Sequence, residues 1–334
     1  MQPERSSGRR VCVTGGLGFV GSRVCALLAD RGYEVVCVDR QSAAYSPGAG
    51  PDAARSLSAR GSVRLLVEDV AQVDLADLLG PAAGVIHLAA LPGVRSGHDA
   101  ETLWRENVAL SERVARAAAR SGTRMVLASS SSVYGNAACL PTPETATPRP
   151  LGVYGESKAA AEAACLGAAP DVVVARLFTV FGPGQRPDMA LSRWIRALRG
   201  GEPLDWRVHA GGARELTYVD DAARGLVAAL ERGRAGEAYN IGGCGSYPME
   251  QVLRLLEREL GRRARLERHA AGLQEAVRTA ACLAKSEREL GHRPRVGLVE
   301  GLRTQLASVG ALGAHAEGRP PRRHARVGAL TPDV

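Results

Sequence analysis

Tyr154 and Lys158 are the first pair of residues in this chain whose types and spacing could do chemistry. They form a Y-x-x-x-K pair, and on a helix two residues four apart share one face. A tyrosine side chain ordinarily has a pKa near 10. Bringing that pKa towards 7 requires roughly 4 kcal/mol, which a neighbouring ammonium and a cationic cofactor ring could share. Tyr154 would then act as a general base towards the hydroxyl of an alcohol or a sugar.

A run of four serines, Ser129 to Ser132, directly follows the apolar segment that ends at Ala128. Ligands of open α/β sheets bind at the carboxyl ends of the strands, which is where this run is expected. A polar loop that caps a helix would explain one or two serines, but not four. The run precedes Tyr154 at a distance that lets strand and helix meet, so both are expected at one site.

A glycine-rich segment near the N-terminus predicts a phosphate-binding loop. Gly16, Gly18 and Gly21 satisfy the G-x-G-x-x-G spacing, and Gly15 adds a glycine at the turn. Glycines there allow a tight turn and a close approach of the backbone to a pyrophosphate, while the helix that follows supplies unpaired N–H groups. Asp39 ends the next expected strand, which completes the pattern of a dinucleotide site.

Asp39 also bears on the choice of dinucleotide. Its carboxylate would accept hydrogen bonds from the adenosine ribose and repel a 2′-phosphate, which favours NAD over NADP. Arg40 beside it opposes this preference, because an arginine there can accommodate a 2′-phosphate. Asp69, after the third expected strand, could contact the adenine, or it could cap a turn.

These residues must be positioned by alternating strands and helices. Buried parallel strands are expected over residues 10–14, 34–39, 63–67, 85–87, 125–128 and 172–176, and helices over 18–30, 101–119 and 154–165. This alternation predicts an α/β fold, a Rossmann-type doubly wound parallel sheet. Residues 8–176 are expected to form this domain and 177–309 a smaller mixed α/β substrate lobe, with a crossing of the chain between the lobes left open. Residues 310–334 are expected to be a disordered tail.

Composition narrows the class of protein. The 334 residues carry a net charge of +8, with 41 arginines and two lysines, which suits an anionic small-molecule substrate. Aromatic residues make up 4% of the chain, too few for base stacking, so we expect no nucleic-acid partner. The sequence has no apolar run long enough for a membrane span and no signal peptide, and its seven cysteines form no C-x-x-C pair. We therefore expect a cytoplasmic protein, and the seven histidines show no metal-binding spacing.

His87 ends an expected strand and is interpreted as a packed histidine that is satisfied by hydrogen bonds. Trp104, Trp194 and Trp206 are expected in the core.

In order along the chain, the motifs T-G-G-x-G-F-x-G, H-L-A-A, S-S-S-S-V-Y-G and Y-x-x-x-K resemble those of the extended short-chain dehydrogenase/reductases, the nucleotide-sugar epimerases and dehydratases. The resemblance covers about residues 10–308. It implies bound NAD, a UDP-sugar substrate and a homodimer built from helices such as 101–119 and 154–165. The implied cofactor-binding residues are Gly15, Gly18, Phe19, Val20, Gly21, Asp39, Arg40, Asp69, Val70, Leu88, Ala89, Ala90, Tyr154 and Lys158.

By the same resemblance, Ser130 is the catalytic serine that joins Tyr154 and Lys158, and it hydrogen-bonds the oxygen at C4 of the sugar. The next two positions distinguish the subfamilies, because dehydratases carry an acidic pair there. This chain has Ser131 and Ser132, which are placed to contact substrate but cannot act as carboxylic acids. Epimerisation is therefore favoured over elimination of water.

The segment from Arg176 to Met189 resembles that of UDP-glucuronate 4-epimerases, most closely those of the actinomycete type found in secondary metabolism. The resemblance implies that Thr179 and Arg186 hold the sugar carboxylate, as the planar fork of an arginine suits. It also places Pro92 and Arg95 in a substrate loop. It further implies that Arg214 and Arg278 bind the nucleotide diphosphate.

The chain departs from the family pattern at residues 207–210, at Ala276 and at Cys282. All these positions belong to the expected substrate lobe, which leaves a different nucleotide sugar open as the substrate. A UDP-glucose/galactose-type 4-epimerase, a 4-keto reductase or dehydratase, and a non-catalytic NAD-binding sensor also stay open as hypotheses. Intact Ser130, Tyr154 and Lys158 argue against the sensor.

Overall fold

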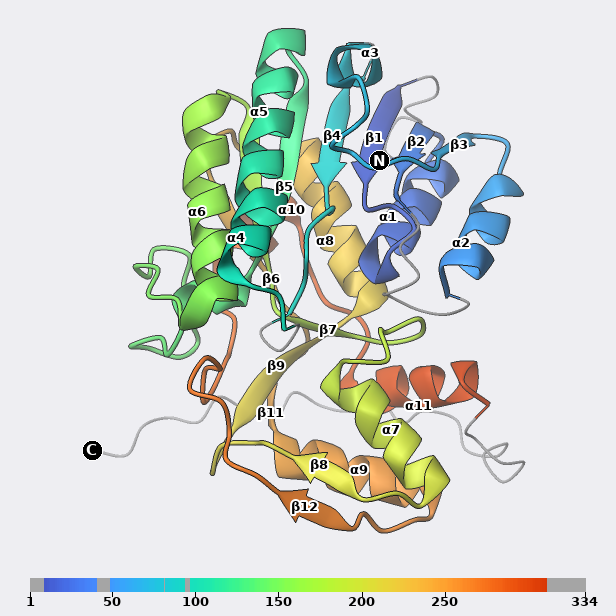
Figure 1. Cartoon of the computed structure of the whole chain (residues 1–334), viewed down its shortest axis with the longest axis vertical. Helices are drawn as coiled ribbons and strands as arrows, with labels where there is room; N and C mark the ends of the chain where they lie inside the picture. Colours follow the sequence, from blue (N-terminus) through green and yellow to red (C-terminus); the bar gives the residue numbers. More distant parts are fainter. Residues whose placement is uncertain (1–8, 41–48, 81, 94–96, 311–334) are drawn as a thin grey trace.

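The computed structural model describes residues 9–40, 49–80, 82–93 and 97–310, which form two lobes (Figure 1). The larger lobe is built on a seven-stranded sheet in the order β10-β6-β5-β4-β1-β2-β3, in which every neighbouring pair is parallel. The strands are β1 (Arg10–Thr14), β2 (Glu34–Val38), β3 (Val63–Leu66), β4 (Gly84–His87), β5 (Arg124–Ser130), β6 (Val172–Leu177) and β10 (Ala238–Ile241). The direction in which successive strands are added reverses between β1 and β4, and ligands of such sheets bind at this switch point.

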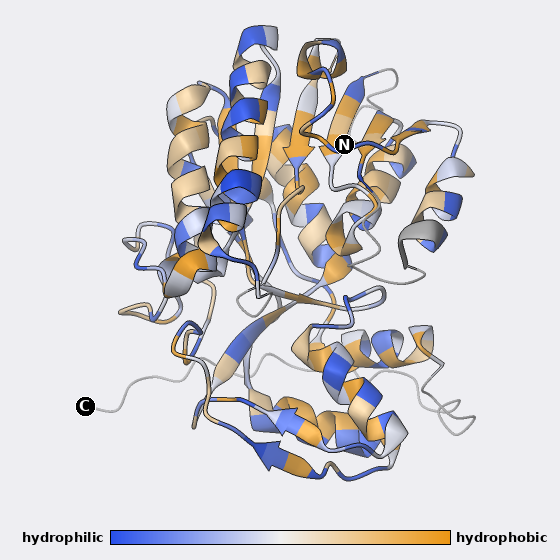
Figure 2. Cartoon of the chain, in the orientation of Figure 1, coloured by the Kyte–Doolittle hydropathy of each residue, from blue (hydrophilic) through white to orange (hydrophobic). Residues whose placement is uncertain are grey.

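Helices cover both faces of this sheet because its strands are apolar on both sides. Val11 and Val13 of β1 contribute to one core, with α1 (Phe19–Asp30), α2 (Ala49–Ser58) and α8 (Val219–Arg232). Cys12, between them, contributes to the opposite core, with α3 (Leu75–Leu79), α5 (Leu110–Ser121) and α6 (Gly152–Ala168). This alternation is the two-residue period of a strand. Figure 2 shows the resulting apolar strands between helices whose outer faces are more polar.

Within the described ranges, the smaller lobe holds two short sheets and three helices. One sheet has the order β11-β9-β7, from β11 (Ser246–Pro248), β9 (Ala213–Tyr218) and β7 (Thr179–Phe181), and the other pairs β8 (Leu204–Trp206) with β12 (Leu266–Arg268). The helices are α7 (Ala190–Gly200), α9 (Met249–Leu260) and α11 (Leu298–Ser308). Trp194 and Trp206 stack in its core with ring centroids 5.1 Å apart, as expected of core tryptophans.

The α/β prediction is confirmed, and the structure refines it in three places. The helix expected over 101–119 is α4 (Ala100–Leu103), a π-helix (Trp104–Ala109) and α5 in succession. Trp104 is not in the core, because its side chain lies on the outside of the π-helix with 44% of its surface exposed. After β9 the chain crosses back, so α8 and β10 belong to the larger lobe, where α10 (Ala284–Leu290) also packs.

None of the helices in the described ranges is long and apolar enough to cross a membrane. The expected tail beyond Gly310 and the predicted substrate residue Arg95 lie outside the described residues.

Candidate active site

The glycine-rich loop connects β1 to α1 and leaves no space for side chains at two of its positions. Gly15 has a φ of +70°, and a Cβ there would lie 2.8 Å from the Ala89 nitrogen. A Cβ on Gly21 would lie 2.8 Å from the Gly16 Cα. The loop is tied to β2 by the Gly15 N–H, which donates to the Val38 carbonyl at 2.8 Å. The N-terminus of α1 therefore opens directly beside the loop, in the arrangement that binds phosphates.

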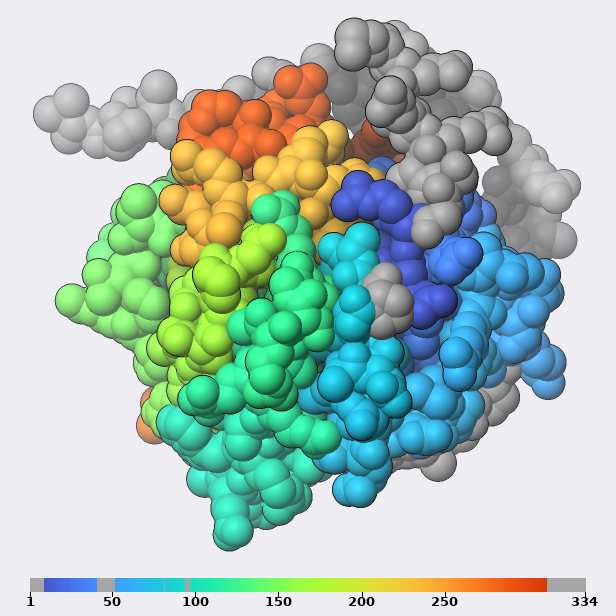
Figure 3. Space-filling model, turned by 90° about the horizontal axis from the view of Figure 1, so that it is seen from above, coloured from blue at the N-terminus to red at the C-terminus, as the bar shows by residue number. Residues whose placement is uncertain are grey.

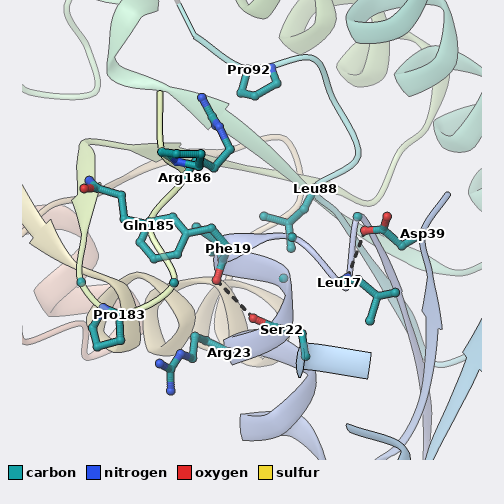
Figure 4. Close-up of a pocket in the computed structure, with 18 of the residues that line it drawn as sticks. Leu17, Phe19, Ser22, Arg23, Asp39, Leu88, Pro92, Pro183, Gln185 and Arg186 are labelled. Carbon is teal, nitrogen blue, oxygen red and sulfur yellow. Dashed lines mark hydrogen bonds between the residues drawn. The ribbon is translucent and has the colours of Figure 1, made fainter. Parts of the chain in front are cut away.

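A cavity of about 1560 Å³ extends from this loop to the helix that carries Tyr154. Figure 4 shows part of its lining, including Phe19, Asp39 and Arg186. Every cofactor-binding residue predicted from the sequence lines it, namely Gly15, Gly18, Phe19, Val20, Gly21, Asp39, Arg40, Asp69, Val70, Leu88, Ala89, Ala90, Tyr154 and Lys158. These residues fit NAD, because a backbone cradle without side chains lies at one part of the cavity and an acidic residue after β2 lies at another. Ala128 and Leu177, from the carboxyl ends of β5 and β6, complete the wall.

The tertiary structure resolves the opposing preferences of Asp39 and Arg40. The Asp39 carboxylate accepts the Leu17 N–H at 3.0 Å, which fixes it against the loop (Figure 4). The Arg40 guanidinium donates to the carboxylates of Asp69 and Glu106 at 3.1 and 3.2 Å. Two acidic partners neutralise this arginine, so the local charge disfavours a 2′-phosphate and favours NAD.

Of its two predicted roles, contact with the adenine and capping of a turn, Asp69 has the second in this structure. Its carboxylate caps a turn by accepting the Ala71 N–H at 2.9 Å. Partial burial acts to raise the pKa of Asp69, but the Ala71 N–H and the Arg40 guanidinium outweigh it and hold the pKa below its usual value. The residue also lines the large cavity.

Helix α6 carries Tyr154 and Lys158 on one face and brings them to the end of β5. Ser130, at the end of β5, lies near enough to the Tyr154 hydroxyl to lower its pKa. Burial raises the pKa of Tyr154, against the lowering effects of the Ser130 hydrogen bond, the Arg186 charge and the Gly93 backbone. In the protein chain by itself, desolvation of the phenolate outweighs these contacts, and the lowered pKa predicted from the sequence includes the charge of a cofactor ring.

Lys158 is almost fully buried, and its ammonium donates to the Ala128 carbonyl at 2.6 Å. Burial lowers the pKa of Lys158 to about 8, while Glu162 on the same helix acts to raise it. An ammonium with a pKa this close to neutrality is unusual, and it is typical of functional sites.

The predicted substrate residues are divided between the large cavity and a smaller one. Pro92 and Arg186 line the large cavity, and Arg186 forms a bidentate pair with Asp188 at 3.0 and 2.9 Å. A smaller cavity of about 130 Å³ is lined by Ser131, Ser132, Thr179 and Arg214. Ser129 lines the large cavity and Ser131 and Ser132 line the smaller one. Ser130 lies between them in the chain and contributes to neither wall, and its hydroxyl donates to that of Ser132 at 3.1 Å.

Arg214 reaches the smaller cavity from β9. Its guanidinium donates to the Val277 carbonyl at 2.9 Å and lies 3.4 Å from the Glu275 carboxylate. Arg278 is not brought to either cavity, since it is exposed and contributes to neither wall. Its predicted diphosphate contact is therefore without support from this arrangement.

Asn107 is a site residue that sequence reasoning missed. It lies fully buried in the π-helix, where its side chain accepts the Leu91 N–H at 2.7 Å and donates to the Leu91 carbonyl and the Ser157 hydroxyl, both at 3.1 Å. It thus ties the loop that precedes Pro92 to the catalytic helix. A polar amide on the apolar face of an amphipathic helix was the signal that could have revealed it.

Comparison with known proteins identifies relatives along most of the chain. Residues 11–242 match the model of the NAD dependent epimerase/dehydratase family. The chain is 31% identical over 312 residues to an uncharacterized UDP-glucose epimerase, YtcB, of Bacillus subtilis, an alignment that covers 91% of this chain and 98% of YtcB.

Two solved structures are also similar. UDP-glucuronic acid 4-epimerase from Bacillus cereus, in complex with UDP-glucuronic acid and NAD, is 32% identical and superimposes with a TM-score of 0.85, covering 90% of this chain and 99% of that one. MoeE5, in complex with UDP-glucuronic acid and NAD, is 36% identical with a TM-score of 0.80 and the same coverage.

Proposed function

The chain belongs to the NAD-dependent epimerase/dehydratase family, and we propose that it interconverts UDP-glucuronic acid and UDP-galacturonic acid by epimerisation at C4. The observation that carries this proposal is the position of Arg186 in the cavity wall, close enough to lower the pKa of Tyr154. A guanidinium next to the catalytic hydroxyl is suited to bind a carboxylate on the reacting sugar. The similar epimerase from Bacillus cereus and the similar protein MoeE5 both bind UDP-glucuronic acid, which supports the same substrate for this chain.

NAD would be held by the glycine-rich loop and Asp39, and when bound it would supply a hydride acceptor and donor for C4 of the sugar. The residues of this chain move the proton and hold the sugar. Tyr154 removes the proton from the C4 hydroxyl as the hydride leaves, and it returns the proton when the hydride comes back. Ser130 hydrogen-bonds the same oxygen, and Lys158, one turn after Tyr154 on the same face of α6, supplies a buried positive charge to the site.

The 4-keto sugar formed in between is a β-keto acid, which could lose carbon dioxide. We propose that Thr179 and Arg186 hold the carboxylate in an orientation that opposes this loss. Ser131 and Ser132 contribute hydroxyls to the smaller cavity. Neither can act as the acid that eliminates water, so dehydration is disfavoured.

The test is incubation of the purified protein with UDP-glucuronic acid, with products resolved by chromatography and NMR. We expect UDP-galacturonic acid, with no gas and no net NADH. Arg186→Ala should lower kcat/KM for UDP-glucuronic acid by about two orders of magnitude, because it leaves the carboxylate without its charged partner. Arg258→Ala is the matched control, since Arg258 also pairs with a neighbouring carboxylate but is exposed on α9.

Rapid interconversion of UDP-glucose and UDP-galactose, without turnover of UDP-glucuronic acid, would overturn the assignment of the carboxylate site. Bound NAD without turnover of either pair would favour another sugar, or the non-catalytic sensor.

We also propose that the protein acts in the cytoplasm as a homodimer and serves secondary metabolism. Supporting the dimer, the outer face of α6 exposes Ala163 and Leu166, and the adjoining π-helix exposes Trp104. Helices α5 and α6 pack side by side on one side of the molecule (Figure 3).

A further inference from the structure

A buried ion pair joins the catalytic helix α6 to β6, and the proposed reaction does not use it. The Arg176 guanidinium of β6 donates to the Glu162 carboxylate of α6 through Nε at 3.0 Å and Nη2 at 2.7 Å. Both side chains are about 7% exposed. Breaking a buried pair of this kind by removal of one partner is strongly destabilising, but an apolar pair of the same size often serves stability equally well. Stability alone therefore does not account for the pair.

The Glu162 carboxylate also reaches the two catalytic elements. It accepts a hydrogen bond from the hydroxyl of Ser129, the residue before Ser130 on β5. On α6 it follows Lys158 by four residues, one turn further along the same face. Arg176 in turn donates to the Tyr134 hydroxyl at 2.9 Å and to the Glu144 carbonyl at 3.2 Å, which fixes the guanidinium from its far side.

We propose that Glu162 is a positioning residue of the active site: held by Arg176, its carboxylate keeps the Lys158 ammonium protonated and aligns the serine end of β5 with α6. This rests on the proposed catalytic role of Lys158. The carboxylate acts on the reaction through Lys158 and Ser129 and does not itself contact the sugar.

The groups that surround Lys158 leave this task to Glu162. Glu162 and Cys165 on α6 act on Lys158, and His87 on β4 feels the Lys158 charge. Tyr154 lies one turn before Lys158 on α6. Further out, Glu112 on α5 acts on Cys165, and Arg176 on β6 contacts Glu162 and Tyr134 of the 3₁₀ turn at Ser131–Tyr134. Burial lowers the pKa of His87 to about 3 and raises those of Cys165 and Tyr134 to about 12, so all three are neutral near pH 7. The charge of Glu112 acts on Cys165, whereas that of Glu162 acts on Lys158 itself.

The chain offers a direct test because it contains only two lysines, Lys158 and Lys285. Protein labelled with ¹³C and ¹⁵N in lysine gives two sets of side-chain signals, and their titration by NMR reports each pKa without substrate. We expect Glu162→Gln to lower the titration midpoint of Lys158 by about one pH unit. Lys285, which is paired with Glu237 at 2.6 Å, should keep its midpoint and serves as the internal control.

The same shift should reach the reaction. The alkaline limb of the pH–rate profile should move down by about one unit in Glu162→Gln, a loss of about tenfold at a pH above both midpoints. Glu156→Gln is the matched control: the same change on the same helix, at an exposed position. If Glu162→Gln does not fold, Glu162→Asp tests the proposal, because it withdraws the charge by one methylene and should give a smaller shift of the same sign.

An unchanged Lys158 midpoint in a folded Glu162→Gln or Glu162→Asp protein would overturn the proposal, whatever the effect on stability. Because the NMR titration needs no turnover, this result is distinct from failure of the proposed substrate.

Discussion

At the scale of single residues, burial shifts the pKa values of the ionisable side chains in the site away from their ordinary values. Lys158 is buried and has a pKa of about 8, and the pKa of Tyr154 is raised. Burial and the Lys158 charge also lower the pKa of His87, to about 3. Its ring is held by the Thr14 hydroxyl at 2.7 Å and the Ser111 hydroxyl at 3.1 Å, so the packed and satisfied histidine predicted from the sequence is confirmed.

The neutral state of His87 predicts a specific acid sensitivity. In the unfolded chain, the pKa of the His87 side chain is about 6.5. Below that pH the unfolded chain takes up a proton that the folded chain refuses until about pH 3. The contribution of His87 to stability is therefore complete above pH 6.5 and is lost as the pH falls. Between pH 7 and pH 5, the unfolding free energy of wild type should therefore fall by about 2 kcal/mol more than that of His87→Gln.

Urea unfolding at the two pH values measures this difference. His98→Gln, at an exposed position, is the control and should show no such change. A His87→Gln protein with the same pH dependence as wild type would contradict the prediction.

At the scale of elements, the cofactor cavity depends on how closely two strands and one helix approach at the glycine-rich loop. Gly15 lies against the backbone of the segment after β4, while Gly21 on α1 lies against the turn itself. The π-helix has a comparable role on the other face of the sheet, because its extra residue turns Asn107 towards Leu91 and Ser157. Such π-helical turns are frequent at functional sites.

Gly21→Ala should lower the unfolding free energy by about 1–3 kcal/mol, since its Cβ has no room beside Gly16. It should also weaken NAD binding, because the loop must shift to admit the methyl group. Gly61→Ala is the matched control, as no atom lies within 4 Å of the added Cβ, and it should change stability by about 0.5 kcal/mol or less. Denaturation and calorimetric titration with NAD measure both effects, and unchanged NAD affinity in Gly21→Ala would count against the role of the loop.

At the scale of the whole molecule, the two lobes share one chain that crosses between them more than once. Segment 179–218 leaves the large sheet, α8 and β10 return to it, and α11 ends in the smaller lobe. Loop 182–188, which carries Arg186, is anchored to α11 of the smaller lobe, whereas Tyr154 lies on α6 of the larger lobe. Within it Gln185 accepts from Gln305 of α11 at 2.8 Å, and the Gly182 N–H donates to Gln305 at 3.2 Å. The position of Arg186 relative to Tyr154 therefore depends on how the lobes pack.

The proposed dimer makes the prediction at this scale. Leu166→Glu places a charge on the exposed apolar face of α6, and a buried unpaired charge is costly, so the variant should be monomeric at concentrations where wild type is dimeric. Sedimentation velocity measures the assembly state. Val299→Glu, on the exposed side of α11, is the control and should remain dimeric. A monomeric wild type, or a dimeric Leu166→Glu protein, would contradict the proposal.

The sequence by itself determined the parallel sheet, the glycine-rich loop and the Tyr154–Lys158 face, because these follow from local rules. Apolar runs, glycine at a positive φ and the four-residue period of a helix act over a few neighbouring residues. Because these local rules position them, the cofactor-binding residues predicted from the sequence all line one cavity. The π-helix was not predicted, because its extra residue leaves the apolar pattern of 101–119 almost unchanged.

Only the tertiary structure decided the electrostatics. It pairs Arg40 with Asp69 and Glu106, which lie on separate segments of the chain. It pairs Glu162 with Arg176, one helical turn from Lys158, and it leaves Arg278 outside both cavities. Charge interactions depend on distance and on burial, and neither quantity exists until distant segments are packed together.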